Sequence, residues 1–464
     1  MLKLTDFRDQ RIHMIGVGGS SMSGLCEMLL KEGYHVTGSD RTRSHAVERL
    51  EQKGVKVTVG HLPETVHGAG LIIYSAAIAE DNPERAEAFR LNIPQMERAV
   101  LLGQLMLGHE VNICISGAHG KTTTSSMTAW VLLDNGLDPA VSIGGRADDL
   151  GGGSRVGSEK AFVAEACEFH GSFLHMFPTV AVVLNIDADH LDYYGDMEHI
   201  VAAFDNFLHL LPENGVAVGW GEDERVMGLL KKLGRRYVTF GMNASCDYYA
   251  DHCVLDENGC GVFDVVYRGE KLSHIALRVA GNFNVLHALA AFAAAREAGV
   301  EPDAIASSLS RFTGVHRRDE LTGIVDGVKI YQDYGHNPAE MRDALHVSKM
   351  KHPRRLWAVM QPHTYSRVIT LFEDYLTCTE EADFTLVTDI CAAREKDPGT
   401  INSQMLVDGM RAHGINAVLT PSFDDTEKYL REHWQPGDLV LTMGCGDINL
   451  LNDQITLHGD TKHE

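Results

Sequence analysis

Short apolar runs alternate with amphipathic stretches over the first hundred residues. The apolar runs are typical of buried strands and lie at residues 11–19, 34–40, 55–60 and 70–78. Between them, residues 20–33 and 46–54 have the apolar spacing of helices. Strands that alternate with amphipathic helices predict βαβ units, and hence a mostly parallel sheet.

The alternation begins again near residue 111 and once more near residue 328. Residues 111–136 predict a strand, a tight loop and a helix, and further strands are predicted over 160–168, 179–190, 328–335, 355–363, 384–390, 416–420 and 438–447. The glycine-rich residues 144–157 are expected to form a surface loop. The predicted fold class is α/β, with three domains over residues 1–105, 106–313 and 314–464.

The composition argues against several classes of protein. The 464 residues carry a formal net charge of −23, which argues against a nucleic-acid partner because phosphate backbones require a basic surface. No apolar run reaches the roughly 18 residues of a bilayer-spanning helix, and the first residues lack a secretory-signal pattern. The nine cysteines form no C-x-x-C pair. We therefore expect a cytoplasmic protein with no membrane partner and no zinc or dithiol site.

A glycine-rich loop, Gly117-Ala-His-Gly-Lys-Thr-Thr-Thr124, connects an apolar strand to a predicted helix. Backbone N–H groups in such a loop bind phosphate oxygens, together with the helix N-terminus. Lys121 would neutralise the terminal phosphates, and the Thr122 hydroxyl would bind Mg²⁺. The usual pattern has a glycine five positions before the Gly-Lys pair, where this chain has Ile115. Nucleotide binding is the prediction, and a glycine turn with a solvated lysine is the alternative.

Acidic side chains and a histidine follow the next two predicted strands. Glu165 and Glu168 belong to one strand end, and Asp187, Asp189 and His190 to the other. Ligands of open parallel sheets bind beyond the carboxyl ends of the strands, so these groups should face the glycine-rich loop. Phosphoryl transfer requires a metal, and carboxylate, imidazole and hydroxyl groups can all be its ligands. We therefore predict a magnesium site here; helix caps or solvated acids are the alternative.

A second glycine-rich turn, Gly16-Val-Gly-Gly-Ser-Ser-Met-Ser-Gly24, joins the first strand to the first helix, and Asp40 ends the next strand. The pattern is similar to a dinucleotide-binding turn, in which the acid holds a ribose hydroxyl. Ser21 occupies the third glycine position. The turn predicts a bound diphosphate but does not distinguish a nicotinamide dinucleotide from a nucleotide sugar.

Nine segments in order along the chain resemble the Mur ligases, the ATP-dependent ligases of bacterial cell-wall synthesis. They are IGVGGSSMSG, SGAHGKTTT, EACE, NIDADHLDYYG, GNFNVLHA, GVHRRDE, QDYGHNPAE, QPHTYSR and GCGDI. The resemblance implies a Rossmann-like UDP-sugar domain, a central P-loop ATPase domain and a Rossmann-like C-terminal domain, with ATP and Mg²⁺ as cofactors. IGVGGSSMSG and EACEFHGSFLH are similar to the alanine-adding branch. The implied reaction joins L-alanine to the muramyl carboxylate of UDP-N-acetylmuramate through an acyl phosphate, in peptidoglycan synthesis.

The resemblance also implies roles for individual residues. ATP would be bound by Gly117, His119, Gly120, Lys121, Thr122, Thr123, Asn284, Arg318 and Asp333. The UDP-sugar and the amine would be bound by Gly18, Ser20, Met22, Ser23, Asp40, Tyr334, His336, His363 and Arg367. The metal ligands would be Thr122, Glu165 and His190. The groups expected at the reacting centre are Lys121, Glu165, His190, His336 and Arg367.

Several positions depart from the family pattern. Cys167 replaces an acid, and Phe283 and His287 replace the residues that commonly flank Asn284. Three alternatives to the alanine-adding ligase stay open. They are a ligase of the same family that adds a whole peptide in murein recycling, a nicotinamide-dependent oxidoreductase that uses the first turn, and a nucleotide-gated binding protein without ligase chemistry.

Overall fold

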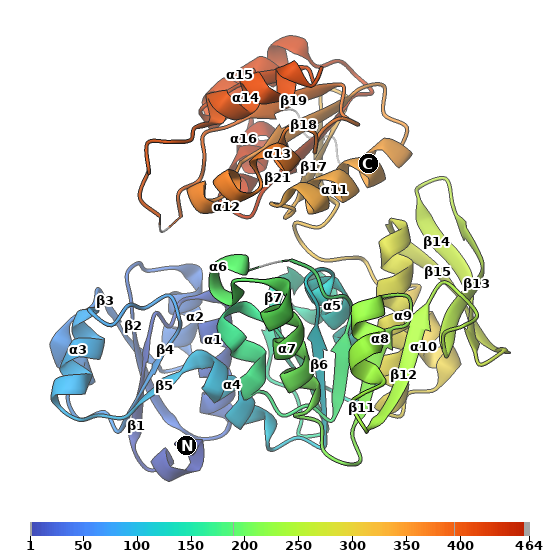
Figure 1. Ribbon diagram of the computed structural model, residues 1–464. Coiled ribbons are helices and arrows are strands. Elements are labelled where there is room, and N and C mark those ends of the chain that lie inside the picture. Colours follow the sequence, from blue (N-terminus) through green and yellow to red (C-terminus); the bar gives the residue numbers. More distant parts are fainter. Residues whose placement is uncertain (1, 189, 394, 459–464) are drawn as a thin grey trace. The chain divides into compact units, whose positions relative to one another are not determined.

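The computed structural model describes residues 2–188, 190–393 and 395–458, which contain three β-sheets flanked by helices (Figure 1). The chain divides into two compact units. The first contains Met1–Val254, Val262–Arg278 and Phe283–Thr313, and the second contains Leu255–Gly261, Val279–Asn282 and Gly314–Glu464. Among the described residues, no helix combines the length and the apolar character that crossing a bilayer requires.

The first sheet has the strand order β3-β2-β1-β4-β5, and all of its strand pairs are parallel. Its elements are β1 (Arg11–Ile15), α1 (Ser20–Lys31), β2 (His35–Asp40), α2 (His45–Gln52), β3 (Lys56–Val59), β4 (Leu71–Tyr74), α3 (Pro83–Arg90), β5 (Gln95–Glu97) and α4 (Arg98–Met106). Strand β4, with the sequence LIIY, is an apolar run because helices cover both faces of a parallel sheet, whereas the buried β1 also contains His13. The predicted βαβ arrangement of this segment is confirmed.

The second sheet has ten strands in the order β15-β14-β13-β12-β11-β10-β6-β9-β7-β8. Its first half contains β6 (Val111–Ser116), α5 (Lys121–Asp134), β7 (Ala140–Ala147), β8 (Gly152–Arg155), β9 (Ala161–Glu165), β10 (Val180–Val183) and α7 (Met197–Leu208). Its second half contains β11 (Val216–Trp220), α8 (Glu224–Leu230), β12 (Arg236–Gly241), β13 (Tyr248–Leu255), β14 (Cys260–Tyr267), β15 (Glu270–Ala280), α9 (Asn282–Glu297) and α10 (Pro302–Leu309). The sequence interpretation did not identify β11 to β15.

The third sheet belongs to the second unit and has the order β16-β17-β21-β18-β19-β20, with only β16 antiparallel to its neighbour. Its strands are β16 (Glu320–Val325), β17 (Val328–Asp333), β18 (Leu356–Met360), β19 (Phe384–Val387), β20 (Ala417–Leu419) and β21 (Leu439–Met443). Its helices are α11 (Pro338–Met350), α12 (Tyr365–Thr370), α13 (Phe372–Tyr375), α14 (Ser403–Ala412), α15 (Phe423–His433) and α16 (Asn449–Leu457).

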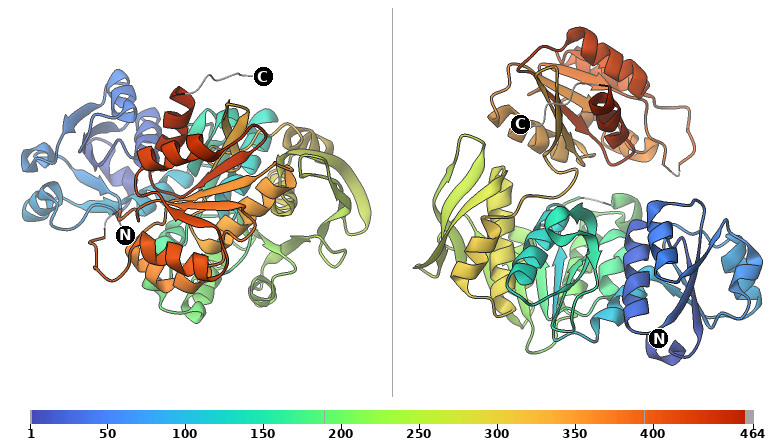
Figure 2. Two further views of the ribbon diagram at one scale, coloured as in Figure 1. Left: turned by 90° about the horizontal axis from the view of Figure 1, so that it is seen from above. Right: turned by 180° about the vertical axis from the view of Figure 1, so that it is seen from behind.

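Helices cover both faces of this third sheet (Figure 2). Because side chains alternate along a strand, Leu356, Ala358 and Met360 of β18 pack into one core with α11 and α14. Trp357 and Val359 pack into a second core with α15 and α16. The α/β class predicted from the sequence is confirmed. Each predicted domain contains one sheet, and the exact boundaries stay predictions.

The expected surface loop at residues 144–157 is wrong. These residues contain the end of β7, a short 3-10 turn and β8, which pairs antiparallel with β7. Helix α1 contacts both strands, and the Lys31 ammonium donates a hydrogen bond to the Gly157 carbonyl. The glycines that suggested a loop instead allow close packing, because a Cβ at Gly153 would collide with the Gly145 carbonyl. On the facing helix α1, a Cβ at Gly24 would overlap the Ser154 side chain.

This packing predicts opposite effects for the same substitution in two helices. Gly24→Ala should destabilise the first unit by about 1–3 kcal/mol, because the added methyl overpacks the contact between α1 and β8. Gly228→Ala in α8 is the matched control, because no atom lies within 4 Å of the added Cβ. The control should gain about 0.5–1 kcal/mol from helix propensity. Urea unfolding followed by circular dichroism measures both changes, and equal midpoints for the two variants would contradict the contact.

Candidate functional site

The glycine-rich loop connects the end of β6 at Ser116 to the start of α5 at Lys121. Gly117 and Gly120 have φ angles of +144° and +81°, a region that residues with side chains rarely adopt. A Cβ at Gly120 would also collide with the ring of His287 on α9. Both glycines are therefore required. Gly117 is needed for the turn, and Gly120 is needed for the turn and for the close approach of the loop to α9.

Strand β6 lies between β9 and β10, so the ends of these three strands meet at one edge of the sheet. Glu165 at the end of β9 pairs with Ile115 of β6. The Thr122 hydroxyl of α5 donates a hydrogen bond of 2.9 Å to Glu165 Oε2, and the Gly144 backbone N–H donates one of 2.9 Å to the same oxygen. The hydroxyl and the carboxylate predicted as metal ligands are therefore in direct contact.

Lys121 and Glu168 form a buried ion pair beside this contact. Lys121 Nζ lies 3.0 Å from Glu168 Oε1, and the Glu168 side chain is 2% exposed. The ammonium also donates hydrogen bonds to the carbonyls of Gly117 (2.5 Å) and Ala118 (3.0 Å). Burial alone would lower the pKa of Lys121, but Glu168 and its neighbouring acids raise it above its ordinary value. Lys121 is therefore charged and points back across its own loop.

The segment that follows β10 contributes a histidine and further groups that contact the glycine-rich loop. His190 Nε2 lies 3.9 Å from Glu168 Oε1, and His119 Nε2 lies 3.7 Å from Asp187 Oδ2. Asn185 accepts a hydrogen bond from the His119 N–H (2.9 Å) and donates one to the His119 carbonyl (3.1 Å). The sequence interpretation missed Asn185, although it stands in the same NIDADH motif. Asp189 lies outside the described residues.

The donor set suits a magnesium ion by its chemistry. Mg²⁺ prefers hard oxygen ligands, which Thr122 and Glu165 supply, and the imidazole of His190 lies close to Glu168. Glu168 Oε2 is buried, and no described group donates a hydrogen bond to it. In the described part of the chain, no three His, Cys, Asp or Glu side chains are already arranged around a common point. These residues therefore fit a magnesium ion that is bound by a hydroxyl and a carboxylate of the protein and, we expect, by phosphate oxygens of the nucleotide.

Asn284, predicted to contact adenine, begins the buried side of α9. It is 7% exposed, and its Oδ1 lies 3.0 Å from His287 Nδ1. The ring of His287 in turn lies against Gly120, and its centroid is 5.7 Å from that of Phe283. The two residues that depart from the family pattern therefore lie next to both Asn284 and the glycine-rich loop.

The first glycine turn has the geometry predicted for a diphosphate-binding turn. Asp40 Oδ2 accepts a hydrogen bond of 2.9 Å from the Gly18 N–H, and α1 begins at Ser20. A Cβ at Gly18 would overlap Asp40 and the neighbouring helix α2. Met22 and Ser23 are each 3% exposed, with Met22 in the hydrophobic core. Gly18, Ser20 and Asp40 thus face the turn, whereas the Met22 side chain packs inside.

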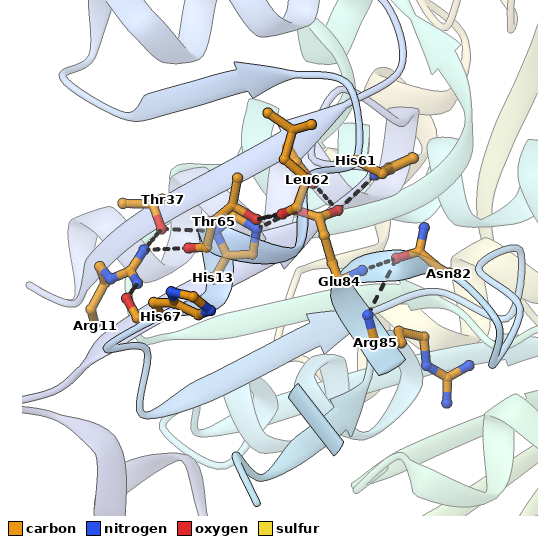
Figure 3. A network of polar contacts seen from close by, with 11 residues as sticks. Arg11, His13, Thr37, His61, Leu62, Thr65, His67, Asn82, Glu84 and Arg85 are labelled. Atoms are coloured by element: carbon orange, nitrogen blue, oxygen red, sulfur yellow. Dashed lines mark hydrogen bonds and ion pairs between the residues drawn. The ribbon is translucent and has the colours of Figure 1, made fainter. Parts of the chain in front are cut away.

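A buried polar network adjoins this turn (Figure 3). Glu84 of α3 is fully buried and accepts hydrogen bonds from the hydroxyls of Ser39 (2.6 Å) and Thr65 (2.5 Å). Its carboxylate also lies 3.0 Å from His13 Nε2 and 2.6 Å from His61 Nδ1. Burial would raise the pKa of Glu84, but these hydrogen bonds lower it below its ordinary value. The sequence interpretation missed the network because its members lie far apart in the chain.

In the second unit, Asp333 ends β17 and is 8% exposed. Its oxygens accept hydrogen bonds from the backbone N–H groups of Gly335 (2.7 Å) and Asp319 (2.9 Å). Arg318 lies 3.8 Å from the carboxylate, and its guanidinium lies 5.4 Å from the centre of the Tyr334 ring. Burial raises the pKa of Asp333, although Arg318 opposes this shift. The structure therefore brings together the three predicted residues Arg318, Asp333 and Tyr334.

The ends of β17 and β18 bring two histidines and an arginine together in the same unit. The rings of His336 and His363 lie 6.3 Å apart, and Arg367 donates hydrogen bonds to the His363 carbonyl (3.1 Å) and to His363 Nδ1 (3.3 Å). Burial lowers the pKa of His336. Burial and the Arg367 charge lower the pKa of His363 to about 4. Both imidazoles are therefore neutral near pH 7.

Comparisons with known proteins relate most of this chain to the Mur ligases. Three family models match it: "Mur ligase family, catalytic domain" over residues 11–110, "Mur ligase middle domain" over 115–295, and "Mur ligase, glutamate ligase domain" over 317–446. A UDP-N-acetylmuramate–L-alanine ligase of Acetivibrio thermocellus is 43% identical over 440 residues, which is 95% of this chain and 94% of that one. The enzyme of that name from Clostridium botulinum strain Okra is 44% identical over 441 residues, with 95% and 96% covered.

Solved structures have the same fold. The UDP-N-acetylmuramate-alanine ligase of Thermotoga maritima superposes with a TM-score of 0.81 at 25% identity, over 97% of this chain and 98% of that one. A murein peptide ligase of Psychrobacter arcticus gives a TM-score of 0.73 at 24% identity with the same coverage. At 24% identity, the similarity to the murein peptide ligase shows a shared fold alone.

The contact between Arg367 and His363 predicts a measurable change. Arg367→Gln should raise the pKa of His363 from about 4 toward the ordinary imidazole value of about 6.5, because a positive charge beside the ring is lost. Burial remains, so the new pKa should stay below the ordinary value. NMR titration of histidine labelled at Cε1 measures it, with His363→Gln to assign the signal. Arg342→Gln is the control, because Arg342 bonds to Thr377 and Asp374. An unchanged His363 pKa in Arg367→Gln would show that the arginine charge has no influence.

Proposed function

This chain belongs to the Mur ligase family, and from that premise we propose that it joins L-alanine to the muramyl carboxylate of UDP-N-acetylmuramate in peptidoglycan synthesis. The observation that carries the proposal is a cluster of five residues that lie at or after the carboxyl ends of β6, β9 and β10, namely Lys121, Thr122, Glu165, Glu168 and His190. A nicotinamide-dependent oxidoreductase would have no use for this cluster. We propose L-alanine as the amine because relatives named UDP-N-acetylmuramate–L-alanine ligase are 43–44% identical over 95% of the chain.

We propose ATP and Mg²⁺ as the cofactors of this cluster. The loop from Gly117 to Thr123 would bind the phosphates through its backbone N–H groups and through Lys121. Thr122, Glu165 and His190 would hold the metal, which offsets charge on the transferred phosphoryl group when it is bound. Asn284, Arg318 and Asp333 remain the proposed contacts for adenine and ribose. Gly18, Ser20 and Asp40 would bind the UDP-sugar, with Met22 and Ser23 supporting the start of α1.

The reaction needs activation because hydroxide is a poor leaving group from a carboxylate. In the proposed route, a muramyl carboxylate oxygen attacks the γ-phosphorus of ATP. The bond between the γ-phosphorus and the oxygen that bridges it to the β-phosphorus breaks, and ADP leaves. The nitrogen of L-alanine then attacks the carbonyl carbon of the acyl phosphate, and phosphate leaves as the amide forms. Lys121 would stabilise charge in the first step and Arg367 the oxyanion in the second. The neutral ring of His336, beside Tyr334 and His363, is suited to accept the proton that the amine releases.

The proposed roles follow the three sheets. Residues 1–105 would bind the UDP-sugar, residues 106–313 the ATP, and residues 314–464 the amino acid and part of the ATP. We also propose that the protein works in the cytoplasm, where ATP and nucleotide-linked precursors are available.

The substrate assignment is tested by the amine that supports ADP release. Purified protein with ATP, Mg²⁺ and UDP-N-acetylmuramate should release ADP only when L-alanine is added, because the acyl phosphate needs a nucleophile to turn over. A coupled spectrophotometric assay measures the release. Dependence on a peptide in place of L-alanine would favour the murein recycling ligase. Turnover of a nicotinamide cofactor would favour an oxidoreductase, and ligand binding without ADP release would favour a binding protein.

The separation of the two nucleotide sites is tested at Lys121. Lys121→Ala should reduce ADP release at least about 100-fold, because a charge-stabilising donor to the phosphoryl group is lost. The affinity for UDP-N-acetylmuramate, measured by calorimetry, should change little, because that ligand is assigned to the first sheet. Lys160→Ala is the control, since Lys160 is exposed just before β9. Equal losses of ADP release and UDP-sugar affinity would contradict the separate sites.

A further inference from the structure

Glu168 is a buried carboxylate that forms an ion pair with Lys121. Its side chain is 2% exposed, and the Lys121 ammonium lies 3.0 Å from Oε1. No described group donates a hydrogen bond to its other oxygen, Oε2. Glu165 differs, because its Oε2 accepts hydrogen bonds from a hydroxyl and a backbone N–H. Glu165 is therefore satisfied by neutral groups, whereas Glu168 relies on Lys121.

The nucleotide competes for the same ammonium. Lys121 Nζ is bound to Glu168 and to the carbonyls of Gly117 and Ala118, so it points back across the loop. To neutralise a phosphate it must turn away from these acceptors. Removing the cation of a buried ion pair is strongly destabilising, because the carboxylate is then left in the interior with its charge uncompensated. Nucleotide binding therefore carries a penalty at Glu168 unless another cation replaces Lys121.

We propose that Glu168 makes nucleotide binding depend on a divalent cation, which takes over from Lys121 as the partner of the buried carboxylate. Oε2 is the oxygen available to the ion, and His190 lies 3.9 Å from Oε1 on the same side chain. Glu168 is thus a positioning residue: it holds Lys121 across the loop without nucleotide and releases it when nucleotide and metal arrive together. The inference rests on the proposed nucleotide role of this loop and gives a specific part to Glu168, which the family resemblance does not place among the metal ligands.

The test compares nucleotide affinity with and without metal. Binding of the non-hydrolysable ATP analogue AMP-PNP is measured by calorimetry in EDTA and in excess Mg²⁺. In Glu168→Gln the metal-free affinity should rise at least tenfold, because Lys121 is no longer held by a charge. The enhancement of affinity by Mg²⁺ should fall at least tenfold relative to the wild type. Glu168→Asp keeps the charge and should retain the wild-type enhancement.

Matched controls separate this role from a purely structural one. Glu222→Gln makes the same change in a carboxylate that accepts hydrogen bonds from Trp220 and Met242 beyond β11, and both affinities should stay at wild-type values. Thermal unfolding without ligand verifies that each variant is folded. If Glu168 only supports the fold, Glu168→Gln lowers the melting temperature and both affinities together, and the metal enhancement stays unchanged. That result, or an unchanged metal-free affinity, overturns the inference. Wild-type protein that binds no AMP-PNP with Mg²⁺ would instead overturn the proposed function.

Discussion

The parallel pairing of β6 with β9 on one side and β10 on the other is the constraint on which the site depends. This pairing brings the ends of three strands to one edge of the sheet, with Glu165 in register with Ile115 and Val183 with Ser116. Polar residues lie at or just beyond these ends, with Glu165 closing β9 and Asn185 following β10, and there they contact Thr122 and His119 near the start of α5. A shift of one residue in the pairing of β6 with β9 would turn Glu165 to the opposite face and away from Thr122.

A few glycines allow close backbone packing around the two glycine-rich turns and between the first two sheets. Gly120 lets the loop approach His287, and Gly18 lets the first turn approach Asp40 and α2. Gly24 lets α1 pack on β8, which connects the first sheet to the second within one unit. In each case a single Cβ would fill the space that the contact needs. The glycine pattern thus serves packing as much as flexibility.

Three of the buried carboxylates in the described part of the chain are accommodated in different ways. Glu84 is surrounded by hydroxyls and imidazoles, which lower its pKa. Asp333 is held by backbone N–H groups near Arg318. Glu168 has a single lysine. The first two arrangements consist of fixed protein groups and stabilise local structure. The third uses a side chain that the proposed reaction requires elsewhere, which is why it is suited to respond to ligands.

The sequence alone determined the α/β class, most strands of the first and third sheets, and the loop with its downstream acids. These features are local: an apolar run, a glycine turn and the residue after a strand are visible within a few positions. The family relationship also followed from motifs in order along the chain. Only the tertiary structure decided that residues 144–157 form a hairpin, that Met22 packs inside, and that β11 to β15 extend the second sheet. It also decided the partners of Glu84 and Glu168, 71 and 47 positions away from His13 and Lys121. Such contacts depend on strand order and burial, which no local pattern encodes.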